Sequence, residues 1–355
     1  MRREFSLYLD IVRLSAAMAV FLSHLSWSRL SGGFLWWLQP YGHSAVIVFF
    51  VLSGFVIQFV VEKKEVIYQD YMVARFARLW SVVVPAVVLT FVLDRIGAAH
   101  DASVYLMDRE TLPALRMGAG VLFLNQSWWW NLSLMSNDAY WSLPYEFWYY
   151  MIFGAASYFK GKKRIVLMLL SAVMAGPCIL LLLPIWLMGV AAYRARNRVT
   201  LNNGMAIGMF IISGIAIATL LMLDGRGIVV RSTSPYLPPS FSPIDFVTAA
   251  FVALHVFSAS YLRLPLLWAS KPITYAASFS FTLYLLHLPL LHFAAAYAPK
   301  QWSNNARGLA FVAFVLIAVV AVGYVTERRK KNVKQLILWM TNPLMRLISN
   351  RERLA

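Results

Sequence analysis

Near the amino terminus, residues 7–27 read LYLDIVRLSAAMAVFLSHLSW, which is long and apolar enough to cross a membrane as one helix. The stretch nevertheless carries Asp10, Arg13 and His24, and ionisable side chains inside a membrane span are costly and usually functional. Arg13 and His24 are separated by roughly three helical turns, so they share one helix face about 16 Å apart along the axis. Asp10 is one turn from Arg13 and can pair with it. The pattern predicts a row of polar side chains across the membrane, which would act on two substrates that arrive from opposite sides.

The composition of the chain requires an integral membrane protein. Of its 355 residues, 60% are hydrophobic, and the mean hydropathy is +0.65. The net charge of +17 could suggest nucleic-acid binding, but the basic residues fall in short loops between apolar runs, as the positive-inside rule describes. We therefore expect no nucleic acid as a partner. The single cysteine, Cys178, rules out an intrachain disulfide, and the first apolar segment lacks a signal-peptide cleavage site, so we expect it to be retained as a helix.

The hydropathy pattern predicts an all-α fold, a polytopic transmembrane helix bundle of about ten spans. The expected spans are residues 6–27, 43–61, 79–94, 139–159, 165–177, 178–194, 204–223, 243–262, 273–297 and 307–326. Residues 117–130 are apolar but short, so we expect them not to span. Both termini are then cytoplasmic and most basic residues lie inside, as in a multi-pass protein of the bacterial inner (plasma) membrane. Residues 329–355 are expected to form a basic amphipathic tail on the inner leaflet.

Three basic side chains could carry chemistry, His24 near one leaflet and the pair Arg75 and Arg78 on the inner side of the other. A neutral imidazole at His24 could accept a proton from a hydroxyl, as in general-base catalysis, although a lone buried histidine can also be structural. Arg75 and Arg78 follow the second span and are one turn apart in what we expect to be an inner loop. Their guanidinium groups could converge on one phosphate, or they could merely fix the topology.

The fourth and ninth spans supply further candidates. The fourth opens with YWSLPYE at 140–146, where Trp141 could stack on a carbohydrate or belong to an aromatic belt. Glu146 could bind a sugar, orient a catalytic histidine or pair with a cation. In the ninth span Tyr284 and His287 share a broad helix face, and His287 fits a structural role as well as a catalytic one. No histidines and acids occur at metal-ligand spacing, so no metal site is predicted.

Together these segments resemble acyltransferase family 3, the membrane O-acyltransferases of the surface-polysaccharide O-acetylase type. The resemblance rests on five motifs in order: Arg-x10-His at 13–24, SAVIVFFVLSGFVI at 44–57, Arg-x-x-Arg at 75–78, Trp-Ser-Leu-x-x-Glu at 141–146 and Leu-Tyr-x-x-His-x-Pro at 283–289. Glu327 also ends the last span, where the family usually carries a glutamate. The chain departs from the pattern at Ala45, where the family has glycine, and in the delay of a proline after Arg78 until Pro85.

The resemblance implies that residues 1–328 form a membrane acyltransferase domain. Such a domain moves an acyl group, usually acetyl, from cytoplasmic acetyl-CoA to a hydroxyl of a cell-surface or lipid-linked saccharide. His24 would be the general base, with Arg13 and Glu146 in the same catalytic centre. Residues for the donor and for the acceptor complete the implied site: Arg75, Arg78 and Arg13 on the CoA, and Trp141, Tyr284, His287 and Asp10 on the substrate.

Two other functions remain compatible with the sequence. One is a transporter or flippase of a glycolipid or oligosaccharide, and the other is an acyltransferase for a small secreted metabolite. The register of Arg13 and His24, together with the Arg75 and Arg78 pair, favours an acyltransferase, because a flippase would not need both. Membrane lipid and a saccharide acceptor are the expected partners, and the sequence predicts no oligomeric state.

Overall fold

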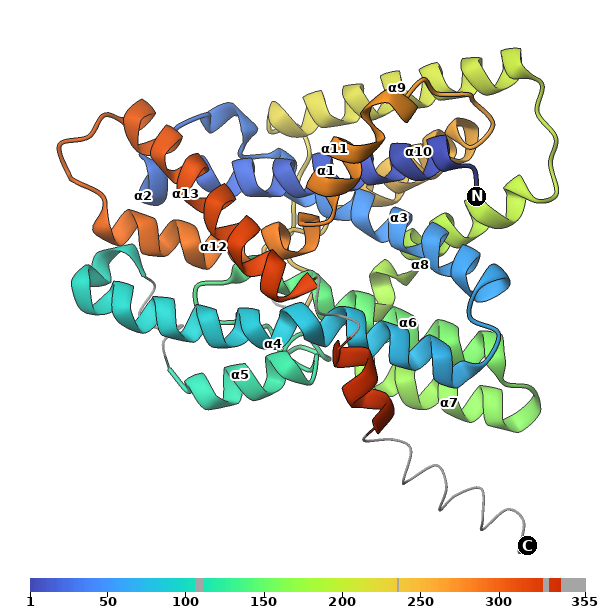
Figure 1. Cartoon of the computed structure of the whole chain (residues 1–355), viewed down its shortest axis with the longest axis horizontal. Helices are drawn as coiled ribbons and strands as arrows, with labels where there is room; N and C mark the ends of the chain where they lie inside the picture. The colour runs from blue at the N-terminus through green and yellow to red at the C-terminus, as the bar shows by residue number, and fades with distance from the viewer. Residues whose placement is uncertain (106–110, 235, 328–331, 340–355) are drawn as a thin grey trace, which may run out of the picture.

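The computed structural model describes residues 1–105, 111–234, 236–327 and 332–339, and this part of the chain is helical without a β-strand. The α-helices are α1 (Arg3–Leu25), α2 (Ser28–Ser31), α3 (Tyr41–Lys63), α4 (Tyr68–His100), α5 (Pro113–Val121), α6 (Ser142–Tyr158), α7 (Gly161–Ala175), α8 (Pro177–Arg196), α9 (Asn203–Gly225), α10 (Ile244–Ala259), α11 (Ser270–Ala277), α12 (Ser280–Tyr297) and α13 (Asn304–Val325). The long helices lie side by side across the view of Figure 1. The prediction of an all-α bundle is confirmed.

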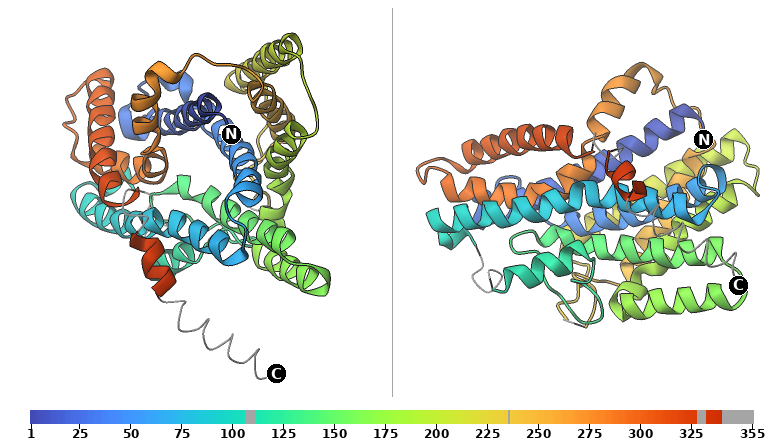
Figure 2. Two further views of the ribbon diagram at one scale, coloured as in Figure 1. Left: turned by 45° about the vertical axis from the view of Figure 1, so that its right-hand side comes forward. Right: turned by 60° about the horizontal axis from the view of Figure 1, so that its bottom comes forward.

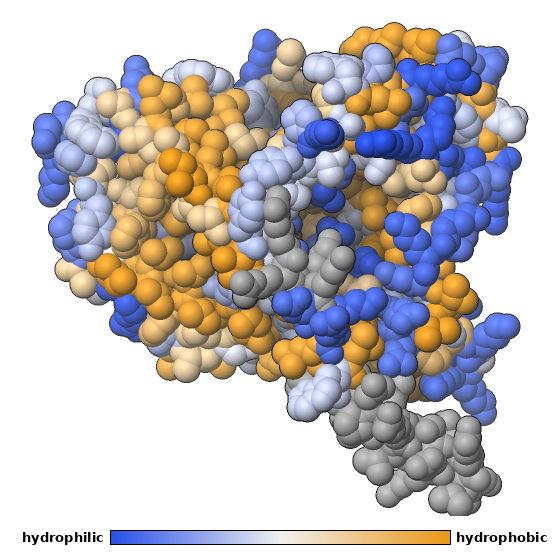
Figure 3. Space-filling view, viewed as in Figure 1, coloured by the Kyte–Doolittle hydropathy of each residue, from blue (hydrophilic) through white to orange (hydrophobic). Residues whose placement is uncertain are grey.

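Seven of these helices are long and apolar enough to cross a membrane: α1, α3, α4, α8, α9, α12 and α13. Three other predicted spans form shorter helices in the same bundle, namely α6 with 17 residues, α7 with 15 and α10 with 16. Apolar side chains cover a broad area of the left half of the molecule in Figure 3, and polar side chains gather at its edges. The chain is therefore a multi-pass membrane protein, while the count of ten spans stays a prediction.

Hydrogen bonds join the helix ends that the charge pattern places on the inner side. The Arg2 guanidinium donates to the carbonyls of Ser260 and Leu262 at 2.7 and 2.8 Å. The Tyr158 hydroxyl donates to the carbonyl of Glu65. The start of α1 and the ends of α3, α6 and α10 therefore meet at one end of the bundle, the N-terminal face.

The opposite end of the bundle, the cavity face, is joined in the same way. Ser23 donates to the carbonyl of Gln39 at 2.6 Å, and the Asn304 amide donates to the carbonyl of Gly32 at 2.7 Å. The end of α1, the start of α3 and the start of α13 therefore lie together. Successive helices alternate between the two faces, as expected for a chain that crosses a membrane repeatedly.

The predicted ninth span, residues 273–297, is not one helix. It is divided into α11 and α12, which end and begin around Ser278 and Phe279. The Arg13 guanidinium donates to the last carbonyl of α11, at Ala277, over 3.3 Å. At the start of α12 the Glu327 carboxylate accepts from the backbone N–H of Thr282 at 2.8 Å and from its hydroxyl at 2.6 Å. A cation at a helix C-terminus and an anion at an N-terminus are both favourable, which explains why the break is stable.

The third span also differs from its prediction. It was expected at residues 79–94 after a loop, but α4 runs without interruption for 33 residues and includes Pro85. Arg75 and Arg78 therefore lie on the first part of this helix rather than in a loop. No glycine or proline separates Tyr68 from Pro85, so nothing in the sequence ends the helix earlier.

The described part of the tail, residues 332–339, is helical and lies beside α4 outside the bundle (Figures 1 and 2). Its apolar residues Leu336 and Trp339 are 54% and 73% exposed. The predicted tail began at residue 329, and residues 329–331 and 340–355 lie outside the described part. Exposed apolar side chains near Lys334 fit a helix that lies on a membrane surface.

Helices α3 and α8 pack backbone against backbone through two glycines. A Cβ atom on Gly54 would lie 2.0 Å from the carbonyl oxygen of Trp186, and one on Gly189 would lie 2.0 Å from that of Val51. Neither position has room for a side chain. This close approach brings the Trp186 indole to the Ser53 hydroxyl, to which it donates at 3.1 Å.

We expect Gly54→Ala to destabilise the protein by about 1–3 kcal/mol or more, because the added methyl group overlaps backbone atoms of α8. The apparent melting temperature in detergent measures the effect. Gly208→Ala on α9 is the matched control, since nothing lies within 4 Å of a Cβ there. Equal melting temperatures for the two variants would contradict the close packing of α3 on α8.

Candidate active site

Helix α1 is one unbroken helix that carries Asp10, Arg13 and His24, as the sequence predicts. Arg13 Nη2 lies 2.9 Å from Asp10 Oδ1, so the predicted pairing is confirmed. The Nε atom of Arg13 is buried and has no hydrogen-bond partner within the described residues. Arg13 therefore has donor capacity left after it binds Asp10 and the carbonyl of Ala277.

Further charges surround Arg13. Those of Arg78, Glu327 and Glu146 all act on its guanidinium. The carboxylates come from α6 and from the residues after α13, and Arg78 comes from α4. Residues that are far apart in the sequence and belong to different helices thus form one cluster of charges within the bundle. Each charge is stabilised by the opposite charges near it.

His24 contacts a second histidine. Its Nδ1 lies 2.9 Å from Nε2 of His287, and Nδ1 of His287 lies 3.0 Å from the carbonyl of Leu283. A carbonyl can only accept, so His287 carries its proton on Nδ1, and in a neutral imidazole its Nε2 must then accept. His24 therefore donates from Nδ1. The remaining nitrogen of His24, Nε2, has no proton and is free to accept one.

His24 lines a cavity of about 760 Å³ on the cavity face, whereas His287 is fully buried behind it. Aromatic side chains from four segments line the same space: Trp27, Trp36, Trp37, Tyr41, Trp141 and Tyr284. Two residues predicted to contact substrate, Trp141 and Tyr284, are thus brought to His24. His287, which was also predicted to contact substrate, instead contacts His24.

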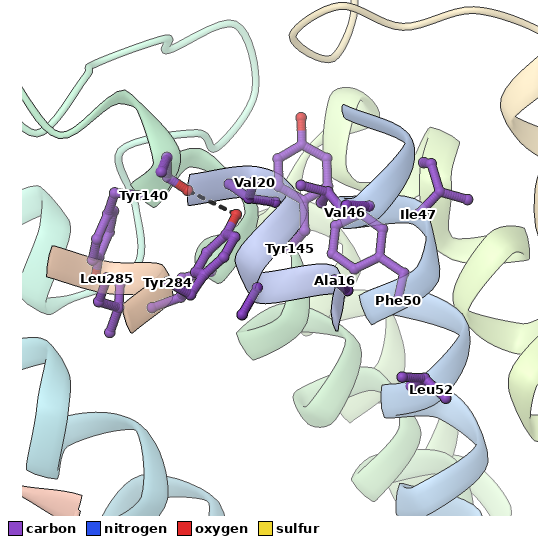
Figure 4. Close-up of a cluster of buried hydrophobic side chains, with 14 of the residues drawn as sticks. Ala16, Val20, Val46, Ile47, Phe50, Leu52, Tyr140, Tyr145, Tyr284 and Leu285 are labelled. Atoms are coloured by element: carbon purple, nitrogen blue, oxygen red, sulfur yellow. Dashed lines mark hydrogen bonds between the residues drawn. The ribbon is translucent and has the colours of Figure 1, made fainter. Parts of the chain in front are cut away.

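Arg13 and Asp10 do not line this cavity. Ala16 and Val20, which lie between Arg13 and His24 along α1, belong to one buried apolar cluster with Val46 and Tyr284 (Figure 4). The Tyr284 hydroxyl donates to the carbonyl of Ala139 at 2.9 Å. The arginine and the histidine lie on one unbroken helix as predicted, and of the two only His24 lines this cavity.

Glu146 does not line the cavity and lies in a partly buried hydrogen-bond network. The hydroxyls of Ser53 and Tyr150 both donate to Glu146 Oε1, at 2.7 Å in the case of Ser53. Glu146 also acts electrostatically on Arg78. Of the three roles that the sequence left open, pairing with cations is the one that this geometry favours.

Arg75 and Arg78 have different surroundings although they are one turn apart. Arg75 is 6% exposed and binds Glu65, with 2.9 Å between Nη2 and Oε1. It lies over the rings of Tyr71 and Tyr150 at 5.6 and 5.7 Å, within cation–π range. Burial raises the pKa of Glu65, and the charge of Arg75 opposes this rise. Arg75 is thus paired with Glu65, although its buried Nε atom, like that of Arg13, has no hydrogen-bond partner among the described residues.

Arg78 has no side-chain hydrogen bond to any part of the chain that the structure describes, although its guanidinium is half-buried. It lies in the field of Glu146 and Glu327. A half-buried guanidinium with its donors unused is suited to an anionic ligand. The two arginines of the predicted phosphate-binding pair therefore differ. Arg75 is paired with Glu65, whereas Arg78 has donors left for a ligand.

A second charged network lies at the mouth of the cavity and was missed by the sequence analysis. Arg231 Nη2 binds Asp224 Oδ2 at 2.5 Å, and its Nη1 lies 3.3 Å from Asp245 Oδ1. His43 Nε2 lies 3.0 Å from Asp245 Oδ2, and its ring stacks on that of Trp141. Although burial opposes it, the hydrogen bonds and charges of the two aspartates raise the pKa of Arg231. The one sequence feature that pointed to this network is that Asp224 and Asp245 lie at the ends of apolar spans.

We expect Arg231→Ala to destabilise the protein by roughly 3–5 kcal/mol, because it leaves two carboxylates that are nearly buried without their cation. The melting temperature in detergent measures the loss. Arg226→Ala is the matched control in the same segment, since that side chain is exposed. A melting temperature equal to that of the control would show that the network contributes nothing to stability.

Comparison with known proteins completes the assignment of this site. Residues 6–328 match the sequence model of the acyltransferase domain of acyltransferase family 3. The chain belongs to this family. It is therefore an acyltransferase, and the transporter or flippase alternative loses its support. Among the described residues, no group of three or more histidines, cysteines and acids could hold a metal ion.

Two relatives are similar to this acyltransferase over most of its length. "Acyltransferase MdmB" of Streptomyces mycarofaciens is 24% identical over 388 aligned positions, which cover 97% of this chain and 92% of the relative. An "O-acetyl transferase" of Shigella phage Sf6 is 26% identical over 262 positions, covering 68% and 76%. No solved structure matches the chain. Together with the family, the second relative identifies the enzyme as an O-acyltransferase.

Proposed function

We propose that this enzyme transfers an acyl group, most simply acetyl, from acyl-CoA to a hydroxyl of a saccharide. The acceptor is a cell-surface or lipid-linked saccharide that enters the cavity, and the donor enters from the N-terminal face, which we assign to the cytoplasm. The observation that carries the proposal is the free Nε2 of His24 at an aromatic cavity, with His287 hydrogen-bonded behind it.

In this mechanism His24 is the general base. Its Nε2 takes the proton of the acceptor hydroxyl as the oxygen attacks the thioester carbonyl. The carbon–sulfur bond then breaks, the acyl group stays on the acceptor oxygen, and the imidazolium returns the proton to the CoA thiolate. His287 acts as a positioning residue, because it accepts from His24 Nδ1 and so keeps the other nitrogen directed to the substrate.

The donor is held by cations on the N-terminal side of His24. Arg78 offers a guanidinium without a hydrogen-bond partner among the described residues, and Arg13 keeps an unused Nε donor. Phosphate and pyrophosphate groups of CoA suit such groups. Val20, which lies between Arg13 and His24 on α1, lines the cavity, so we place the path of the acyl group along this face of the helix.

The acceptor is recognised by the aromatic cavity. Trp141 and Tyr284 offer apolar ring faces, and the hydroxyl and carboxylate groups at the mouth offer hydrogen bonds to sugar hydroxyls. The phage relative named as an O-acetyl transferase supports acetyl as the group transferred to oxygen. A small secreted metabolite with a hydroxyl would use the same machinery. With the inner side assigned to the N-terminal face, the described part of the tail, residues 332–339, lies on the cytoplasmic side of the catalytic domain.

The proposal is tested by mass spectrometry of surface and lipid-linked saccharides from cells with and without the gene. We expect loss of the mass of one acyl group from one saccharide, and its return when the gene is supplied. Purified enzyme in lipid nanodiscs should also release free CoA only when acyl-CoA and that saccharide are both present. Unchanged saccharides and no CoA release would overturn the proposal.

A further inference from the structure

Helix α12 carries Pro289 in its interior, two residues after His287. Proline has no N–H, so it cannot donate to the carbonyl four residues earlier, which is that of Leu285. Leu285 is fully buried, and an unpaired carbonyl at such a site is costly. The turn that carries Tyr284 and His287 therefore needs a donor from elsewhere.

Asn137 supplies this donor. Its side-chain amide donates from Nδ2 to the carbonyl of Leu285 at 2.7 Å, across 148 residues of sequence. The side chain is fully buried, so water does not compete for the bond. Since a carbonyl only accepts, the amide nitrogen must face it, which fixes the orientation of Asn137.

Asn137 is held by its own surroundings. Its backbone N–H donates to the carbonyl of Leu134 at 2.9 Å, which closes a tight turn. The preceding residue, Ser136, donates to the buried carboxylate of Asp94 on α4, from its N–H at 2.9 Å and from its hydroxyl at 2.7 Å. The turn is thus fixed to α4, and Asn137 presents its amide to α12 from a rigid support.

The chain that follows Asn137 binds the same turn of α12 again. The Tyr284 hydroxyl donates to the carbonyl of Ala139 and lies 2.6 Å from the hydroxyl of Ser142. His287 lies on α12 between these contacts and Pro289, and its Nε2 accepts a hydrogen bond from His24. A displacement of the kinked turn would therefore move His287 and, through it, His24.

We propose that Asn137 is a positioning residue of the catalytic centre. It replaces the backbone donor that Pro289 removes, and so holds the turn of α12 that aims His287 at His24. This inference rests on the proposed role of His24 as the base. Asn137 touches no substrate and acts only through the geometry of α12.

A double-mutant cycle tests the proposal. Asn137→Ala should lower kcat roughly 10- to 100-fold with KM for both substrates within about twofold, since small misplacements at a reacting centre have effects of this size. In the Pro289→Ala background, the backbone N–H of residue 289 can again donate to the carbonyl of Leu285. Asn137→Ala should then change kcat by at most about twofold and the melting temperature by at most a few degrees. Equal losses in both backgrounds would overturn the proposal.

One further variant and a second use of the double variant keep the test decisive. Asn137→Asp keeps the shape but sets an oxygen against the carbonyl of Leu285, so it should be worse than Asn137→Ala; a milder effect would contradict the proposal. If Asn137→Ala fails to fold, the double variant with Pro289→Ala should restore folding, and failure to do so would count against the proposal.

Asn125→Ala is the matched control. Asn125 is 1% exposed and donates to the carbonyl of Leu132 at 3.2 Å, and within the described residues its amide makes no hydrogen bond to α12. It should lower the melting temperature without lowering kcat; an equal loss of kcat would show that any loosening of this loop has the same result. Full activity of a His24 variant would instead refute the base assignment, while the melting temperatures of the cycle would still report on the Asn137 bond.

Discussion

Replacing His24 with alanine is expected to lower kcat by roughly 10²–10⁴-fold while leaving the protein folded and inserted. The reason is that the acceptor hydroxyl loses the only group that we assign to take its proton. Binding of acyl-CoA should change little, because the cations that hold the donor lie elsewhere. Release of CoA from acetyl-CoA in nanodiscs, with the acceptor saturating, measures the effect.

His255→Ala is the control for this loss. His255 is also a membrane-embedded histidine, and its Nδ1 lies 3.0 Å from the hydroxyl of Ser213 and 3.1 Å from the carbonyl of Phe210. It does not line the cavity, so its removal should leave kcat within about twofold. His287→Ala should lie between the two, since His24 remains but loses its orienting partner. Full activity of His24→Ala would refute the base assignment.

The opening helix shows what could be predicted from sequence alone. The spacing of Asp10, Arg13 and His24 predicts an ion pair and a shared face, and both occur. These are contacts within one helix, where the period of 3.6 residues decides which side chains meet. The positions of most helices were predictable for a different reason. A long apolar segment with basic residues at its flanks has few other structures open to it than a membrane span.

Contacts between helices could not be predicted in this way. His24 and His287 are separated by 263 residues, and nothing near either of them indicates the other. The division of the ninth span into α11 and α12 has the same cause. Its apolar pattern is continuous, and the groups that stabilise the break, Arg13 and Glu327, belong to distant helices.

The two arginines of α4 show a further limit. Their spacing predicts a common ligand, but Glu65 occupies Arg75 and leaves Arg78 available. The sequence contains Glu65 only ten residues before Arg75. The prediction was incomplete because the chain turns sharply between α3 and α4, and a turn of that kind brings a carboxylate onto a helix face without any periodic signal.

Arg78→Gln is expected to weaken the binding of acetyl-CoA by roughly 10- to 100-fold, because a charge-assisted hydrogen bond to phosphate contributes about 1.5–3 kcal/mol. The substitution keeps much of the side chain's volume but removes its charge. Isothermal titration calorimetry in detergent measures the affinity. The loss should shrink at high salt, since the ions of the buffer screen the remaining attraction between protein and phosphate.

Arg75→Gln separates a binding role from a structural one. Because Arg75 is already paired with Glu65, its loss should lower the melting temperature and leave the affinity for acetyl-CoA within a fewfold of the original. The opposite result, weak binding in Arg75→Gln and unchanged binding in Arg78→Gln, would mean that the donor displaces Glu65 from its arginine. Arg78 would then serve only to balance Glu146 and Glu327, and the donor site would have to be moved one turn toward the N-terminal face.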